Sequence, residues 1–152
     1  MVSQKGLSNE FIIDSAAVSY EEEGNDMYPH AKDILKKHNI PFEHHSARRI
    51  QTSDYNKFNY IICMDESNLN NIMRIIGDDT QNKVCRLLDF SSNPRDISDP
   101  WYTGNFEKAY QDINEGLEYL LIFLKWFLVH NFLKGRSHQE NLNTKYNCKV
   151  WV

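Results

Sequence analysis

Residues 60–69, Tyr-Ile-Ile-Cys-Met-Asp-Glu-Ser-Asn-Leu, decide the fold class of this chain. The first five form a continuous apolar run, which is typical of a strand covered on both faces. Asp65 follows at once, and its carboxylate can accept backbone N–H bonds at the start of a helix. Apolar side chains then recur at helical spacing from Leu69 through Ile72 until Gly77, which suits a helix end. This order predicts one strand–helix unit of a parallel α/β sheet.

The same alternation extends on both sides of this stretch. Upstream, an apolar strand at 11–17 precedes a helix that begins at Pro29, where a missing N–H costs nothing. Downstream, a strand at 84–88 precedes a long helix, 106–124, with one apolar face. We therefore predict an α/β fold in three layers, a parallel sheet with helices on both faces. In such folds the chemistry lies at the carboxyl ends of the strands.

The composition excludes several classes of function. The chain has 152 residues and a net charge of -4, which argues against binding to nucleic acid or to an anionic membrane surface. Three Cys do not make a disulfide framework, and no spacing of Cys or His suggests a metal site. No motif calls for a cofactor. Because the start has no basic segment leading into an apolar one, we expect a cytoplasmic protein.

Five segments in order resemble one enzyme family. They are Asp-Ser-Ala-Ala at 14–17, Gly-Asn at 24–25, His-Ser-Ala-Arg-Arg-Ile at 45–50, the stretch 58–69, and Asp-Pro-Trp-Tyr at 99–102. From about residue 7 to about residue 124 the chain resembles the low-molecular-weight protein-tyrosine phosphatases. The resemblance implies a phosphotyrosine phosphatase I-like fold, whose first strand lies between the second and third. It also implies a hydrolase that cleaves phosphotyrosine proteins or aryl phosphates through a phosphocysteine intermediate.

The family's phosphate loop is absent from these residues. That loop reads Cys, five residues, then Arg, and follows the first strand. A thiolate there is stabilised by a helix N-terminus, while backbone N–H groups and the Arg hold the phosphate. Here Cys63 is followed six positions later by Leu69 and Cys85 by Ser91, and Cys148 lies near the end. We expect Cys63 and Cys85 to be buried structural thiols. We also expect a truncated domain that lacks its first central strand and has no phosphatase activity.

The resemblance assigns roles to six residues that remain. Asp99 matches the general acid that protonates the leaving phenolate, and Trp101 and Tyr102 match the aromatic wall for the substrate ring. Three polar residues match groups that brace the phosphate loop or lie at its rim: Ser15, His45 and Asp65. From the residues alone, the favoured interpretation of Asp99 is an Asp-Pro turn before a helix, and that of Trp101 and Tyr102 is a partly buried aromatic pair on a loop. Without a loop to brace, the other three favour capping or solvated roles.

We divide the chain into two parts by their net charge and amino-acid composition. Residues 1–124 form the incomplete phosphatase domain, with a net charge of -8, and residues 125–152 form an apolar helix extension and a basic tail of unknown role, with a net charge of +4. The apolar stretch is interrupted by charged side chains and is short of a membrane span. We expect self-association through the exposed sheet edge and the apolar helix. The favoured interpretation of residues 148–152 is unrelated sequence; the alternative is a strand that fills the vacant central position, as in a circular permutation.

Three other functions remain compatible with the sequence. A non-catalytic binding module could use the wall formed by Trp101 and Tyr102, and a non-functional gene fragment would carry the same residues. An arsenate reductase-like protein shares this fold in one of its families. It also needs the Cys-to-Arg loop and adds resolving cysteines, so the aromatic pair favours the phosphatase branch.

Overall fold

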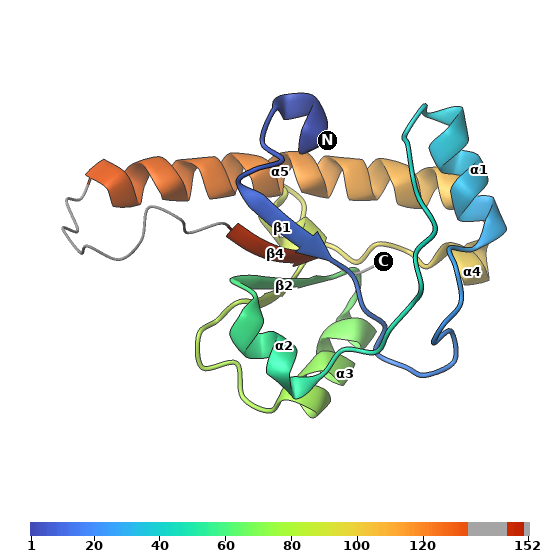
Figure 1. Ribbon diagram of the computed structural model, residues 1–152, viewed down its shortest axis with the longest axis horizontal. Coiled ribbons are helices and arrows are strands. Elements are labelled where there is room, and N and C mark those ends of the chain that lie inside the picture. The colour runs from blue at the N-terminus through green and yellow to red at the C-terminus, as the bar shows by residue number, and fades with distance from the viewer. Residues whose placement is uncertain (134–145, 151–152) are drawn as a thin grey trace.

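The computed structural model describes residues 1–133 and 146–150 of the chain. Within them, a parallel sheet with the order β1-β4-β2-β3 lies between helices (Figure 1). The strands are β1 (Phe11–Asp14), β2 (Tyr60–Cys63), β3 (Val84–Arg86) and β4 (Tyr146–Val150). The helices are α1 (Pro29–Lys37), α2 (Thr52–Lys57), α3 (Glu66–Ile76), α4 (Pro100–Thr103) and α5 (Phe106–Leu133), with short 3-10 turns η1 (Ser3–Lys5) and η2 (Leu87–Phe90).

The two faces of β2 define the layers, because side chains alternate along a strand. Ile62 packs into a cluster with Leu120 and Leu124 of α5, on the face that also carries η2. Ile61 packs on the other face with Ile72 of α3. All five side chains are almost fully buried. The predicted three-layer α/β architecture is therefore confirmed.

The strand β4 occupies the central position beside β1. It runs parallel to β1, from the pair Phe11 and Tyr146 to the pair Asp14 and Lys149, and parallel to β2, where Tyr60 pairs with Cys148. The alternative prediction of a strand at 148–152 in the vacant position is thus confirmed for residues 148–150, and β4 begins two residues earlier, at Tyr146. The physical reason is that inner strand edges need partners for every N–H and C=O. The favoured interpretation as unrelated sequence concerns the origin of the tail and stays a prediction. The predicted strand residues 151–152 lie outside the described residues.

The element boundaries follow local hydrogen bonds. The strand predicted at 11–17 ends at Asp14, because Ala17 pairs only with Arg49, in an isolated bridge. The strand predicted at 84–88 ends at Arg86, where Leu87 begins η2. The long helix continues past residue 124 to Leu133. In the part of the chain that the structure describes, no helix combines the length and apolarity that crossing a membrane requires.

Candidate functional site

The loop that follows β1 brings Ser15 next to His45. A hydrogen bond of 2.9 Å joins Ser15 Oγ and His45 Nε2, so these two residues, predicted from the family resemblance, do meet in space. The backbone N–H of His45 donates to Asp26 Oδ1 at 3.1 Å. Hydrogen bonds to Asp26, first from Lys32 and then from the backbone of His45 and Met27, hold the pKa of that carboxyl far below its usual value. The charged Asp26, which sequence reasoning missed, thus fixes His45 beside Ser15.

An arginine ties the end of β1 to α2. Arg48 donates to Asp14 at the carboxyl end of β1 and to Asp54 of α2. Burial opposes the charge on Arg48, but the hydrogen bonds to Asp54 and Asp14 raise its pKa above the usual value. Asp54, only 2% exposed, also accepts the backbone N–H of Gln51 at the start of α2. This network holds the strand end from which the Ser15 loop departs.

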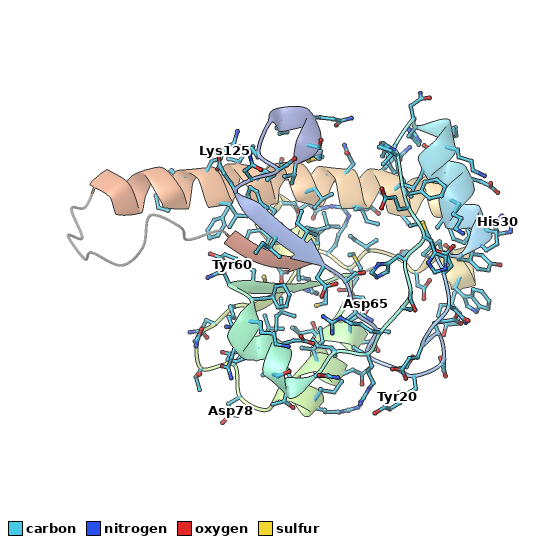
Figure 2. All side chains as sticks on the ribbon, viewed as in Figure 1. Tyr20, His30, Tyr60, Asp65, Asp78 and Lys125 are labelled. Atoms are coloured by element: carbon cyan, nitrogen blue, oxygen red, sulfur yellow. The ribbon has the colours of Figure 1, made fainter. Side chains whose placement is uncertain are left out.

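Asp65 caps the helix that follows β2. Its Oδ1 accepts the backbone N–H of Asn68 at 2.6 Å, which satisfies a donor in the first turn of α3. Figure 2 shows Asp65 near the centre of the molecule, at the carboxyl edge of the sheet. Among the residues described, it makes no hydrogen bond to Ser15, His45 or Asp99. The capping role expected from the residues is therefore confirmed, and the rim role inferred from the family stays a prediction.

The loop before Asp99 is attached to the carboxyl ends of β2 and β3. The backbone N–H of Ile97 donates to the carbonyl of Met64 at 2.9 Å. Asp96 Oδ1 accepts from Arg86 at 2.8 Å and from the backbone N–H of Glu66 at 3.2 Å. Hydrogen bonds to Asp89 and then to Asp96 raise the pKa of Arg86 above its usual value. Sequence reasoning missed this attachment, because an Arg at a strand end carries no pattern that names its partner.

The same loop is also attached to α5. Arg95 donates to Asp112 Oδ1 at 2.6 Å and to Glu115 Oε2 at 2.8 Å. Asp112 is 4% exposed. Its burial alone would raise its pKa, but hydrogen bonds from Lys108 and Arg95 bring the pKa below the usual value. With one attachment to the sheet and another to α5, the loop holds Asp99 in a defined place.

Asp99 begins the one-turn helix α4. Its Oδ1 accepts the backbone N–H of Trp101 at 2.8 Å. Its Oδ2 accepts no hydrogen bond from the described residues, and the side chain is exposed. The turn expected from Asp-Pro is confirmed, and the cap leaves one carboxylate oxygen open to solvent.

The aromatic pair after Asp99 is exposed. Trp101 is 66% and Tyr102 85% exposed, so the expectation of a partly buried pair is wrong. Trp101 packs edge-on against Tyr28, with ring centroids 5.3 Å apart, and Tyr28 stacks on Phe106 at 5.8 Å. His30 lies 5.4 Å from Tyr28, and Figure 2 shows it at the α1 side of the molecule. These rings form an aromatic surface beside Asp99. The part of Tyr28 in this surface was not predicted, because a single Tyr before a Pro does not indicate which residues it contacts.

The two thiols whose surroundings are described differ in burial. Cys63 is fully buried in β2, and its Sγ–H donates to the carbonyl of Cys85 at 3.4 Å. Burial raises the pKa of Cys63 far above its usual value, which keeps it a neutral thiol. Cys85 is only partly buried, so the expectation of a buried thiol is wrong at this position. The structural role predicted for Cys63 is therefore confirmed. Within the described residues, no group of three His, Cys, Asp or Glu side chains could hold a metal ion.

The comparisons agree with this fold. A family profile described as "Low molecular weight phosphotyrosine protein phosphatase" matches residues 1–128. The low molecular weight protein-tyrosine-phosphatase YfkJ of Bacillus subtilis is 35% identical over 123 residues, 80% of this chain and 79% of the relative. The human low molecular weight phosphotyrosine protein phosphatase is 37% identical over 119 residues, 73% of each chain.

A third relative and one solved structure also match the chain. The PtpA phosphatase of Staphylococcus haemolyticus is 39% identical over 99 residues, 63% of this chain and 62% of its own length. The crystal structure of YfkJ superimposes with a TM-score of 0.77 at 34% identity, over 82% of this chain and 79% of that one. Profile, sequence and structure lead to the same conclusion: the chain belongs to the low molecular weight phosphotyrosine protein phosphatase family.

Proposed function

We propose that these residues carry the acid and substrate-ring half of a phosphotyrosine phosphatase site. The observation that supports this most is the arrangement around α4. There an exposed Asp99 carboxylate stands at the helix start, and the exposed rings of Trp101 and Tyr102 follow within the same turn. A phosphotyrosine ring that packs on these side chains brings its phenolic oxygen near the carboxyl group. Asp99 then acts as the general acid, donating a proton to the phenolate as the P–O bond breaks.

Ser15 and His45 belong to the phosphate side of the same proposal. Their hydrogen bond lies at the carboxyl edge of the sheet, where the β1 loop emerges. A preformed pair of this kind can donate to or accept from a loop that wraps a phosphate group. Asp26 keeps the pair in position, since its carboxylate holds the His45 backbone.

The chain by itself is expected not to turn over phosphotyrosine. Within the 152 residues, no Cys is followed by Arg at the sixth position, and the buried Cys63 cannot replace a nucleophile. A general acid alone supplies only about 10²–10⁴-fold in rate.

A p-nitrophenyl phosphate assay of the purified chain tests this expectation. The rate should equal that of buffer. Turnover that Asp99→Asn abolishes, and that the exposed control Asp78→Asn leaves unchanged, would refute it.

A non-catalytic binding module is the second candidate. It is favoured by the exposure of Trp101 together with its packing on Tyr28, which holds the indole rigidly at the surface. Indole fluorescence titrated with a tyrosine-phosphorylated peptide distinguishes the two functions. Saturable binding that needs the phosphate and is lost in Trp101→Ala would favour the module. Without such binding, the incomplete catalytic site remains the better description.

A further inference from the structure

One side of α5 is apolar although it faces solvent. The side of the helix that packs on the sheet carries Leu120 and Leu124. On the opposite side, Ile122 is 65% exposed, Trp126 59% and Tyr119 36%. These three positions are separated by three and four residues, so they form one stripe along the helix. An exposed apolar stripe of this kind marks an interaction surface.

Two opposite charges flank this stripe. Glu118 and Lys125 are both exposed, and neither forms an ion pair with another residue that the structure describes. They lie about 10 Å apart along the helix axis, which is too far for them to pair within one copy of the chain. At about 3.6 residues per turn, both charges lie on one side of Ile122 and the two aromatic rings lie on the other. The charged groups are therefore available to a partner that packs on the stripe.

The stripe and its charges are nearly symmetric about Ile122. Glu118 lies four residues before Ile122 and Lys125 three after it, while Tyr119 lies three before and Trp126 four after. An antiparallel second copy, with the twofold axis at Ile122, therefore places each Glu118 against Lys125 of the other copy. The same axis places each Tyr119 against Trp126, because an isologous interface makes every contact twice. A parallel second copy would instead place the aromatic side of one helix against the charged side of the other.

The surface beside Ile122 is hollowed where an antiparallel copy would reach it. The hollow has a volume of about 540 Å³, and Glu118, Tyr119 and Ile122 are among the residues that line it. With the twofold axis at Ile122, Trp126 of the second copy lies opposite position 118, at this hollow. A Trp that fills a pocket near the centre of an interface typically contributes more binding energy than its neighbours do.

The length of α5 lets two copies lie side by side. Figure 1 shows this helix along one edge of the molecule, extending past the sheet. A copy centred on Ile122 can run beside residues 111–133, about 33 Å of helix. Charges that flank an apolar seam determine which helices pair and in which direction, and the chain itself supplies the helix that matches this face. We propose that the exposed side of α5 is a homodimer interface, on which a second copy of this chain packs antiparallel about Ile122.

Sedimentation velocity of the full chain over a range of concentrations tests the dimer. A single helix pair buries less surface than a standard interface, so we expect a monomer–dimer equilibrium in the micromolar range. Ile122→Asp should weaken the dimer by about tenfold or more, because the twofold axis brings the two new carboxylates together. Ile13→Asp is the matched control, since Ile13 is also exposed, at 53%, but lies on β1. Circular dichroism of both variants checks that they fold.

Charge reversal tests the antiparallel arrangement. Glu118→Lys and Lys125→Glu each bring like charges together twice, so each variant should dimerise more weakly, and the effect should shrink at high salt. The double variant should regain the dimer, because opposite charges face each other again. An equimolar mixture of the two single variants should also dimerise, since each copy then supplies the charge that the other lacks.

The outcomes decide between this interface and other modes of association. A dimer weakened by Ile122→Asp and not by Ile13→Asp, and regained in the double charge variant, supports the proposal. A chain that stays monomeric at every concentration overturns it. A dimer lost in Ile13→Asp and kept in Ile122→Asp would place the contact at the sheet edge instead. Charge variants that do not rescue each other would exclude the antiparallel pairing.

Discussion

A proline placed in β4 should destabilise the whole sheet, because β4 is an inner strand. Cys148 pairs with Ile13 of β1 on one side and with Tyr60 of β2 on the other. Proline at position 148 removes a backbone donor and leaves the facing carbonyl buried without a partner, at about 1–3 kcal/mol, and its ring does not fit an inner strand. We expect a loss of about 3 kcal/mol, which is a drop in Tm of about 6–12 °C for a domain of this size.

Thermal and urea unfolding, followed by far-UV circular dichroism, measure this loss. The matched control is Cys148→Val, which keeps the backbone N–H and has a high strand propensity. A chain that ends before residue 146 should be less stable still, because β1 and β2 would then face each other without a strand between them. If Cys148→Pro and Cys148→Val melt within 2 °C of each other, about the least that 1 kcal/mol would cause, β4 does not contribute to the folded sheet.

Three further measurements concern the layers around the sheet. Gly116→Ala should lower the free energy of unfolding by about 1–2 kcal/mol, because the new Cβ would lie 2.6 Å from Cγ of the buried Leu87. This overpacking outweighs the gain in helix propensity. A urea midpoint of the variant above that of the wild type would contradict this expectation. Asp112 has a lowered pKa, so its ion pairs stabilise the chain above about pH 4 and are lost as the pH falls through the folded-state value. Asp112→Asn should therefore flatten the loss of stability between pH 5 and pH 2.5, and equal slopes in the two proteins would count against these ion pairs. Iodoacetamide at pH 8 should leave Cys63 unmodified in the folded chain, because the thiol is buried and neutral, and mass spectrometry showing rapid labelling there would exclude the buried position.

The backbone pattern of the first 124 residues was predictable because each signal is local. The apolar run at 60–64 and the cap at Asp65 determine β2 and α3 without reference to anything distant, and both are found where expected. The strand at 84–88 was predicted too long. Its apolar residues Leu87 and Leu88 lie in a 3-10 turn that buries them as completely as a strand would. Hydrophobicity reports burial, and it does not distinguish these two backbones.

The position of β4 could be predicted only as an alternative, because it depends on contacts between residues that lie far apart in the sequence. Nothing in residues 146–150 specifies β1 and β2 as partners; the vacancy in the sheet, known only through the family resemblance, suggested them. The residues of the candidate site also divide into those predicted from a local motif and those found only in the folded structure. Ser15 and His45 were predicted from their motifs and meet, whereas Asp26, which holds His45, and Tyr28, which packs on Trp101, follow only from the folded geometry.

The placement of the acid loop is independent of whatever lies at the end of β4. Arg86 with Asp96 attaches the loop to β3, the hydrogen bond from Ile97 to Met64 attaches it to the end of β2, and Arg95 with Asp112 attaches it to α5. None of these contacts involves β4 or the loop after β1. The described residues therefore hold Asp99 in place without help from β4. A large movement of the acid loop would break two sets of charged hydrogen bonds, one to Arg86 and one from Arg95. The attachments thus favour an acid loop that is already in place in the folded chain.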